Sequence, residues 1–389
     1  MAIQEDAFPH RDYDLPEGLE RHIDAAPQGA YTDPRVLASE QRAVFENDWV
    51  VVGRAGLIPN PGDYFCAMVG TKPVIVMRQQ DGSISAMGNF CLHRYARLLE
   101  GTGNTRRIVC PYHHWTYQMS GDLIGVPDRM GFEREAIGNR KLDPLACEVA
   151  FGFIYVSLRD DLPPVAERLS RLNELIGNFG LEDYEDRHVV HEELWDGNWK
   201  LLIENFIESY HTTYTHPRSI GPTNPTHLAE FGPLGDPNFA IHSNSYRDED
   251  VPDIFNPRLT EAEKRRFYVI SLFPNGLAAL DANFVWWMAL EPLGTGRTNA
   301  RWGLSYAPDT MAGHEDAEAF CDAIREVIET ATEEDKEMVE RVQSGAGFGS
   351  RTTGLLHAPL EVNIKEFNDY LARRISETTA QTVREVRPE

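Results

Sequence analysis

The segments NFCLHR (residues 89–94) and CPYHHW (residues 110–115) decide how the first half of this chain folds. Each segment contributes one cysteine and one histidine, namely Cys91 with His93 and Cys110 with His113. Two thiolates and two imidazoles on separate loops suit a [2Fe–2S] cluster with two cysteines on one iron and two histidines on the other. The same residue types can hold structural zinc, but zinc fingers usually place two cysteines before two histidines. The spacing therefore favours an iron–sulfur cluster.

Short β-rich runs surround these two loops. WVVVGRAG, DYFCAMVG, KPVIVMRQ, SISAMGNF and FGFIYVSL are separated by turn signals such as Asp81-Gly82. This pattern predicts a small all-β domain over residues 46–158, which would hold the cluster. Residues 1–45 are predicted to form an N-terminal segment that packs on the larger domain formed by residues 159–389.

The remainder of the chain, residues 159–389, predicts a larger α+β domain. Helical patterns fall at residues 163–179, 199–213, 317–343 and 362–375, and strand patterns at 188–195, 267–273, 276–280, 284–290 and 300–307. Between them, residues 217–266 are rich in Pro, Asn, Gly and Asp. We expect this loop-rich stretch to be a lid or a partner surface.

Composition excludes several classes of protein. The chain has 37 Lys and Arg against 61 Asp and Glu, a formal net charge of −24, so we expect no nucleic-acid or anionic-membrane partner. No apolar run approaches the 18 residues of a membrane span. The five cysteines are widely spaced and odd in number, and the N-terminus shows no apolar signal segment. These features predict a cytoplasmic protein with reduced cysteines.

A second set of metal ligands is predicted in the segment NWKLLIENFIESYHTTYTHP. Asn205, Glu208 and His211 are three residues apart, so in a helix they would lie on one face. His216 comes five residues after His211, which turns it away from that face on a straight helix. We therefore expect the helix to unwind between the two histidines.

A carboxylate ligand can be sought by patterning. In the predicted helix 317–343, Asp335 falls within an apolar stripe, where a buried carboxylate needs a cation or strong donors. Glu204, seven residues before His211, is the alternative. Two histidines and one carboxylate form the facial triad of non-haem Fe(II) oxygenases.

With both constellations present, the chain resembles the Rieske non-haem iron oxygenases, and in particular the α subunits of ring-hydroxylating oxygenases. C-x-H-R…C-P-Y-H-x-W is similar to their Rieske motif, and N-W-K-x₃-E-N-x₂-E-x-Y-H-x₄-H is similar to their catalytic signature. The resemblance spans nearly the whole chain. It implies a Rieske [2Fe–2S] domain joined to a catalytic domain with a central antiparallel sheet and helices, of the helix-grip or START-like kind. One departure is His114, where the family usually has glycine, and we interpret it as a tolerated loop histidine.

The resemblance also implies roles for the site residues. A mononuclear Fe(II) would be held by His211, His216 and Asp335, with Asn205 and Glu208 as catalytic residues beside them. The cluster of one subunit would pass electrons through Glu208 to the iron of its neighbour in a homotrimer. Electrons would come from NAD(P)H through a separate reductase or ferredoxin, because the chain has no G-x-G-x-x-G of its own.

Such a protein would be the terminal component of an oxygenase, a monooxygenase or dioxygenase that uses O₂ to hydroxylate or oxidatively demethylate a small organic substrate. The favoured substrate is a methylated ammonium compound such as a betaine, held by cation–π contacts. The Glu at position 208 resembles that branch of the family. The alternative is an aromatic carboxylate, which would need Arg218 or Arg247 inside the pocket.

Trp286 and Trp287 are further candidates for contact with substrate. Adjacent residues of a strand face opposite sides of a sheet, so only one of the two can face the pocket. A Rieske electron carrier with an inactive second domain and a non-enzymatic [2Fe–2S] sensor are more distant alternatives to an oxygenase.

Overall fold

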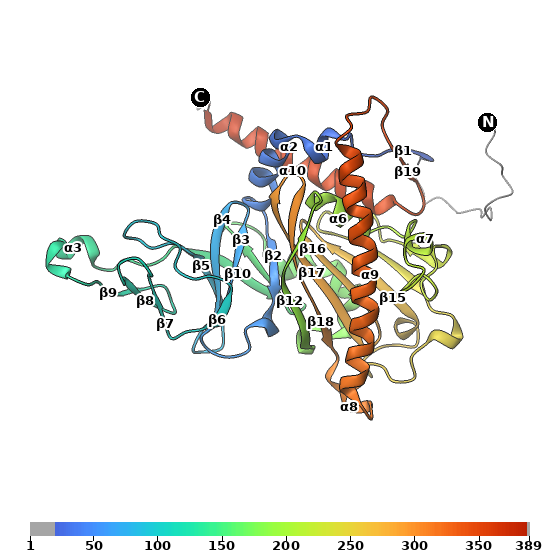
Figure 1. Ribbon diagram of the computed structural model, residues 1–389, viewed down its shortest axis with the longest axis horizontal. Helices are drawn as coiled ribbons and strands as arrows, with labels where there is room; N and C mark the ends of the chain where they lie inside the picture. Colours follow the sequence, from blue (N-terminus) through green and yellow to red (C-terminus); the bar gives the residue numbers. More distant parts are fainter. Residues whose placement is uncertain (1–19, 387–389) are drawn as a thin grey trace.

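The computed structural model of the chain describes residues 20–386, with side chains to residue 380. The first nineteen residues of the predicted N-terminal segment lie outside this range. Figure 1 shows an elongated molecule with a narrow lobe at one end and a broad lobe at the other. Each lobe is built on a seven-stranded antiparallel sheet.

The narrow lobe contains the first seven-stranded sheet and, at its tip, a three-stranded sheet. The first sheet has the order β2-β11-β10-β5-β4-β3-β6, and the tip has the order β7-β8-β9. Their bounds are β2 Val50–Arg54, β3 Asp63–Val69, β4 Lys72–Arg78, β5 Ile84–Gly88, β6 Thr102–Asn104, β7 Arg107–Val109, β8 Thr116–Gln118, β9 Leu123–Gly125, β10 Pro144–Ala150 and β11 Phe153–Ser157. A short helix, α3 (Arg134–Ile137), follows β9 at the far end of this lobe (Figure 1).

The broad lobe holds the second sheet, with the order β12-β18-β17-β16-β15-β14-β13. These strands are β12 Glu185–Trp195, β13 Ala229–Phe231, β14 Phe239–Ser245, β15 Arg266–Leu272, β16 Gly276–Leu280, β17 Phe284–Gly294 and β18 Arg297–Tyr306. The 30-residue helix α9 (Ala317–Ala346) runs alongside this sheet (Figure 1). The α+β class predicted from the sequence, with its β-only lobe and its antiparallel catalytic sheet, is confirmed. The domain bounds 1–45, 46–158 and 159–389 stay predictions.

The remaining elements cover the ends of the sheets. They are β1 His22–Asp24, α1 Gly29–Thr32, α2 Pro34–Glu40 with a π-helical turn Gln41–Phe45, α4 Val165–Arg168, α5 Ser170–Ile176, α6 Trp199–Phe206, α7 Thr212–Thr215, α8 Pro308–Gly313, β19 Leu355–His357 and α10 Val362–Val386. Strand β1 pairs with β19, and α10 packs beside the π-helical turn and α2. Across residues 20–386, no helix is both long and apolar enough to cross a lipid bilayer.

The loop-rich stretch 217–266 differs from its prediction. It contains β13 and β14, and β14 is an inner strand of the broad sheet, paired with β13 on one side and β15 on the other. The sequence of β14, FAIHSNS, carries His242, Ser243 and Asn244, which are buried polar residues. These polar residues hide the strand pattern, because a strand is expected to alternate apolar and polar positions.

Two buried polar side chains join the sheets of the two lobes. Arg301 of β18 donates hydrogen bonds to the carbonyls of Val52 (2.7 Å) and Cys66 (2.9 Å) in the narrow lobe. Asn275 accepts from the backbone N–H of Val51 (3.0 Å) and donates to its carbonyl (2.8 Å). The lobes are therefore held together by buried hydrogen bonds as well as by apolar contacts.

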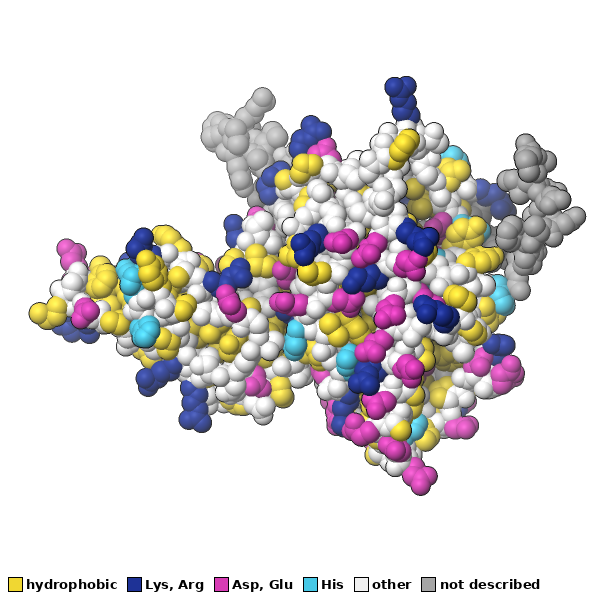
Figure 2. Space-filling view, in the orientation of Figure 1, with side chains coloured by type: hydrophobic (Ala, Val, Ile, Leu, Met, Phe, Trp, Pro, Cys, Tyr) yellow, Lys and Arg dark blue, Asp and Glu magenta, His cyan; other side chains and the backbone are white. Residues whose placement is uncertain are grey.

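Charge is unevenly spread over the surface. Figure 2 shows acidic side chains gathered over α8 and α9 at the broad end. Exposed acidic residues of this region include Glu318, Asp322, Glu326, Glu333 and Glu337. Much of the net negative charge visible on this face therefore lies on the broad lobe.

A buried ion pair fastens the N-terminal helices to α6. Lys200 and Glu40 have side chains that are each 2% exposed, and Lys200 Nζ lies 2.8 Å from Glu40 Oε1. Glu40 also accepts from Trp199 Nε1 at 3.0 Å. The network thus links α2 to the helix that leads into the candidate site.

We expect Glu40→Ala to destabilise the broad lobe by about 3–5 kcal/mol, because it leaves the Lys200 ammonium buried without its partner. The urea midpoint of the broad lobe, followed by tryptophan fluorescence, measures this loss. The double variant Glu40→Leu with Lys200→Met should lose less than Glu40→Ala alone. Asp369→Ala, which removes an exposed pair with Lys365, is the control and should leave the midpoint unchanged.

Candidate metal centres and substrate cavity

Cys91 and Cys110 each begin a tight loop of the same geometry at the tip of the narrow lobe. The backbone N–H of Tyr95 donates to the carbonyl of Cys91 (2.8 Å), and that of His114 donates to the carbonyl of Cys110 (3.0 Å). The closing residues, Tyr95 and His114, both adopt left-handed backbone, with φ of 62° and 57°. Glycine suits such a position best, but histidine is among the residues that tolerate it. The exposed His114 fits the interpretation of a tolerated loop residue.

The four candidate cluster ligands converge from these loops. Both cysteines are buried and neither forms a disulfide, while the two imidazoles are partly exposed. Nδ1 of His93 lies 3.2 Å from Nδ1 of His113, so one iron can bind both nitrogens. Burial raises the pKa of the Cys91 thiol, whose sulfur lies 3.3 Å from the Tyr117 hydroxyl. Two buried cysteines and two imidazoles on a pair of loops are the donor set of a [2Fe–2S] cluster of the Rieske kind, which these residues therefore fit.

The second candidate site begins where α6 ends. The predicted helix 199–213 stops at Phe206, so Glu208 and His211 do not climb one helical face as expected. The Glu208 carboxylate accepts hydrogen bonds from the backbone N–H groups of Tyr210 and His211, the latter at 3.2 Å. A side-chain acceptor that captures backbone donors competes with the helix. The unwinding therefore precedes His211, and the short helix α7 follows it.

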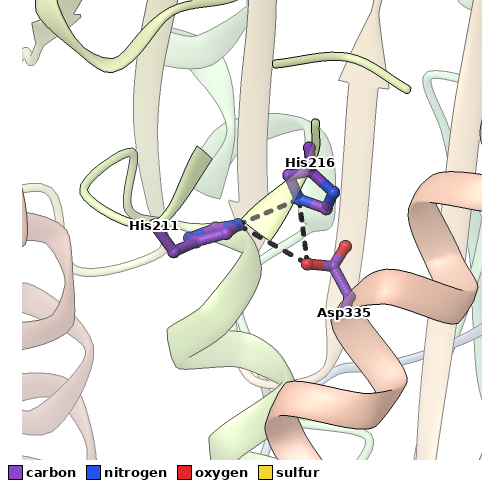
Figure 3. Close-up of side chains that lie close together, drawn as sticks. All are labelled: His211, His216 and Asp335. Atoms are coloured by element: carbon purple, nitrogen blue, oxygen red, sulfur yellow. Dashed lines mark hydrogen bonds and ion pairs between the residues drawn. The ribbon is translucent and has the colours of Figure 1, made fainter. Parts of the chain in front are cut away.

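His211 just before α7, His216 just after α7 and Asp335 on α9 come together (Figure 3). Nε2 of His211 lies 3.2 Å from Nε2 of His216, and Asp335 Oδ1 lies 3.1 Å from His216 Nε2 and 3.5 Å from His211 Nε2. Ligand bonds of about 2.1 Å at right angles place donor atoms about 3 Å apart. Within residues 20–386, this is the single group of three or more such side chains close enough to share an ion.

The charges at this site also fit a divalent cation. Burial by itself would raise the pKa of Asp335, but hydrogen bonds from His211 and His216 hold that pKa well below its ordinary value. Asn205 Nδ2 donates to Asp335 Oδ1 at 2.8 Å and so helps to orient the carboxylate. An ionised buried carboxylate beside two imidazoles is the donor set of a facial triad. The residues therefore fit a mononuclear iron.

Glu208 contacts the other side of His211. Its carboxylate is hydrogen-bonded to His211 Nδ1, so Nε2 of that ring is left to face Asp335. The side chain of Glu208 is 8% exposed, and the side chain of His211 19% exposed. Glu204, the alternative ligand, lies elsewhere: its carboxylate accepts from the hydroxyl of Tyr31 at 2.8 Å. Glu204 does not join the two histidines.

Glu334 is a residue of the site that the sequence analysis does not single out. Its Oε2 lies 3.1 Å from His216 Nδ1, and its Oε1 accepts from Arg218 Nε at 3.1 Å. Arg218, a candidate for substrate contact, is instead paired with this carboxylate and has a 66% exposed side chain. Each candidate ligand histidine thus has a carboxylate on its outer nitrogen, which fixes the tautomer and orientation of the ring.

We expect Glu334→Ala to weaken iron binding at the mononuclear site about 10- to 100-fold, because His216 loses the acceptor that orients it. Metal content after dialysis against graded chelator measures this loss. The matched control is Glu333→Ala, since Glu333 is the neighbouring residue of the same helix and is exposed. Equal metal loss in the two variants would contradict this role for Glu334.

A cavity that is partly open to solvent lies between α9 and the broad sheet and reaches His211, His216 and Asp335. Its wall includes Phe206, Phe267, Trp286, Asn224, His242 and Asn244. Of the described residues that line it, none is Lys or Arg. Arg247 is half exposed and pairs with Glu249 and Asp250 outside the cavity.

The two adjacent tryptophans separate as strand alternation requires. Trp286 faces the cavity, with its ring centroid 4.8 Å from that of Phe206. Trp287 is fully buried on the opposite face of the sheet and does not line the cavity. Trp287, Arg218 and Arg247 therefore do not line the cavity, although the sequence makes them candidates for contact with substrate.

Comparison with known proteins finds a matching family for each lobe of the molecule. Residues 181–377 match the family described as ring hydroxylating alpha subunit (catalytic domain), and residues 48–134 match the Rieske [2Fe-2S] domain. The fold is similar to that of a quaternary ammonium Rieske monooxygenase, with a TM-score of 0.77 and 22% identity, over 91% of this chain and 96% of that chain.

Two curated relatives differ in what their names say they oxidise. The glycine betaine monooxygenase oxygenase subunit of Chromohalobacter salexigens is 35% identical over 57% of this chain and 48% of its own length. The toluate 1,2-dioxygenase subunit alpha of Pseudomonas putida is 31% identical over 48% of this chain and 43% of its own length. The chain thus matches about half the length of each. Because the catalytic-domain match covers half of the chain and a Rieske domain precedes it, this protein belongs to the Rieske ring-hydroxylating oxygenase alpha-subunit family.

Proposed function

We propose that this chain is the terminal oxygenase component of a Rieske-type oxygenase, and that it oxidatively demethylates a methylated ammonium compound. The observation that carries the proposal is the convergence of His211, His216 and Asp335 at one wall of an aromatic cavity. When bound, ferrous iron at these residues supplies the reduction of dioxygen, and a [2Fe–2S] cluster at Cys91, His93, Cys110 and His113 supplies single electrons.

The cavity wall favours an ammonium group over a carboxylate. Phe206, Phe267 and Trp286 present aromatic rings, which attract cations through their π faces. An aromatic carboxylate would have no Lys or Arg partner among the described lining residues. The name of the glycine betaine relative supports the ammonium group, although glycine betaine also carries a carboxylate. Hydroxylation of an aromatic compound is the second candidate, which the name of the toluate relative favours.

The proposed reaction balances with two electrons and two protons. An N-methyl C–H bond becomes C–OH with one oxygen atom of O₂, and the other oxygen atom leaves as water. The N-hydroxymethyl product then loses formaldehyde, which breaks the C–N bond and leaves the demethylated amine. The two electrons come from NAD(P)H through a separate reductase or ferredoxin, since the chain has no dinucleotide motif.

The chain's own residues prepare the site for this reaction. Glu208 and Glu334 hold the two imidazoles in fixed orientations, and Asn205 holds the carboxylate of Asp335. The apolar wall excludes bulk water from the reacting methyl group. The cavity is partly open to solvent, so substrate can reach the site from that side.

We also propose that electrons pass between subunits of a homotrimer. The Cys110 loop connects β7 to β8 at the end of the narrow lobe, whereas α7 lies in the broad lobe at the other end of the same chain (Figure 1). A route within one chain would be long. A neighbouring subunit can place its His93 or His113 near Glu208, which then joins the two metal sites. The cytoplasmic location expected from the sequence stays a prediction.

The test is a substrate screen with the purified chain, a Rieske reductase, NADH and O₂. We expect formaldehyde to appear with methylammonium compounds, in a ratio of one per O₂ consumed. Toluate and salicylate should give no hydroxylated product above the rate without enzyme. Ring hydroxylation without formaldehyde would replace this proposal with the second candidate. O₂-independent oxidation of the cluster alone would indicate an electron carrier.

A further inference from the structure

In the cavity wall, His242 and Asn224, like Trp286, each keep one hydrogen-bonding atom without a partner among the described residues. In the first two residues these atoms are Nδ1 of His242 and Oδ1 of Asn224. Both residues line the cavity, and they are 4% and 6% exposed. Buried polar atoms are usually hydrogen-bonded, so an unsatisfied pair in a binding cavity requires an explanation.

Sheet register shows that His242 faces the cavity. His242 pairs with Val269, Val269 with Ala279, and Ala279 with Trp286, across four neighbouring strands. Directly paired residues project from the same face of a sheet, and all four line the cavity. Ile241, the neighbour of His242 in β14, belongs to the core on the opposite face. The His242 ring therefore stands in a row that forms the cavity floor.

Neighbouring contacts fix the free nitrogen of His242 as a hydrogen-bond acceptor. The ring is hydrogen-bonded to the backbone of Ile207, and because Nδ1 has no partner, that bond uses Nε2. The backbone N–H of Ile207 already donates to the carbonyl of Ile203 at 3.1 Å, so the group that Ile207 offers to the ring is its carbonyl, which accepts from Nε2–H. Burial lowers the pKa of His242, which keeps the ring neutral. In a neutral imidazole with Nε2 protonated, Nδ1 is an acceptor.

The free atom of Asn224 is also an acceptor. The Thr223 hydroxyl donates to the carbonyl of Ile220 at 3.1 Å, so towards Asn224 it can only accept. The side-chain atom of Asn224 that lies 3.2 Å from Thr223 Oγ1 is therefore the amide nitrogen. The remaining atom is the carbonyl oxygen. Two acceptors of fixed role thus lie in the wall of one cavity.

We propose that the substrate presents an O–H or N–H hydrogen-bond donor to His242 and Asn224, so that the cavity selects methylammonium compounds with such a donor over those without one. A ligand without a donor would bury both acceptors unsatisfied, and sites of this kind reject such ligands strongly. The inference rests on the proposed function and adds the substrate's second recognition element. The indole N–H of Trp286, another residue of the cavity wall, also lacks a partner, but as a donor it can meet only an acceptor, so it recognises a different group from His242 and Asn224.

The test compares the affinities of three probes of similar size for the iron-loaded full chain, by anaerobic calorimetry. Butyltrimethylammonium has no donor, 4-hydroxybutyltrimethylammonium has an O–H, and protonated N,N-dimethylbutylamine has an N–H. We expect at least one donor probe to bind about 10- to 100-fold more tightly than butyltrimethylammonium, as the loss of a buried hydrogen bond predicts. The donor probe that shows this preference identifies which of the two groups the site reads.

Variants then locate the preference. His242→Phe and Asn224→Leu keep the size of each side chain and remove its acceptor, so each should reduce the affinity ratio towards one. His242→Gln can donate to Ile207 and still offer an oxygen, so it should retain most of the ratio. A merely structural role would weaken all three probes equally. That result, or equal affinity of the three probes for the unaltered chain, would overturn the proposal.

Two further measurements keep the outcomes separate. Benzoate that binds the unaltered chain and is lost in His242→Phe would show that His242 acts as a donor, which also overturns the proposal. Formaldehyde release from the same samples tests the proposed function independently. Its absence with all three probes would refute demethylation, while the affinity ratios would still decide the role of His242 and Asn224. If His242→Phe does not fold, Asn224→Leu alone decides the question.

Discussion

Replacing Asp335 with alanine is expected to remove about one iron per chain and to abolish turnover, because a facial triad that loses its only carboxylate retains two neutral ligands. Asp335 Oδ1 is the atom that faces both His211 Nε2 and His216 Nε2, at 3.5 Å and 3.1 Å. The [2Fe–2S] absorption should be unchanged, since Cys91 and Cys110 lie in the other lobe. Iron analysis together with the visible spectrum separates the two metal sites.

The control for Asp335 is Glu204→Gln. Glu204 was the alternative carboxylate from the sequence, but its carboxylate is bound to the Tyr31 hydroxyl, a contact that glutamine can also make. We expect this variant to keep both its iron and its activity. If Glu204→Gln lost the mononuclear iron while Asp335→Ala retained it, the carboxylate assignment would be wrong.

Replacing Glu208 with glutamine is expected to slow electron transfer from the cluster to the mononuclear iron about 100-fold or more, with both metal sites assembled. Glu208 is hydrogen-bonded to His211 Nδ1, and a neighbouring subunit's cluster histidine would meet its other side in the proposed trimer. Glutamine keeps the size of the side chain and loses its charge. Single-turnover reoxidation of the pre-reduced cluster, with substrate and O₂, measures the step.

Cluster reduction by the reductase is the internal control for Glu208→Gln, and it should stay fast in the same samples. Iron content should also stay near that of the unaltered chain, because glutamine can still accept from a backbone N–H near His211. Cluster reoxidation at the unaltered rate would refute the bridging role. Glu208 would then act only on the local backbone and on the orientation of His211.

Ligands that are close in the sequence could be predicted from the sequence. Cys91 with His93, and Cys110 with His113, lie two and three residues apart on short loops, so local backbone already brings each pair together. The structure then brings the two loops within 3.2 Å at their Nδ1 atoms. Regular strands can also be predicted from the sequence. The strand pattern at residues 276–280 has the same bounds as β16, Gly276–Leu280, in the structure. Apolar runs between turn signals depend little on distant contacts.

Secondary structure could not be predicted from periodicity where polar side chains bind the backbone or replace apolar residues. His242 and Asn244 made β14 read as loop, although its backbone pairs with two strands. The helical pattern 199–213 includes residues 207–211, but these residues are not helical. The Glu208 carboxylate accepts from backbone N–H groups that a helix would use. In both places side-chain hydrogen bonds, which periodicity does not record, decided the local structure.

The sequence by itself determined the family, the two metal constellations and the class of each lobe, because these depend on residue types at short, fixed spacings. Only the tertiary structure decided which side chains face the cavity. Trp286 and Trp287 are indistinguishable as letters, but the twofold alternation of β17 places one in the cavity and the other in the opposite core. Arg218 follows His216 closely, yet it pairs with Glu334, 116 residues away. A buried carboxylate attracts the nearest guanidinium in space, and that neighbour is set by how α7 packs against α9.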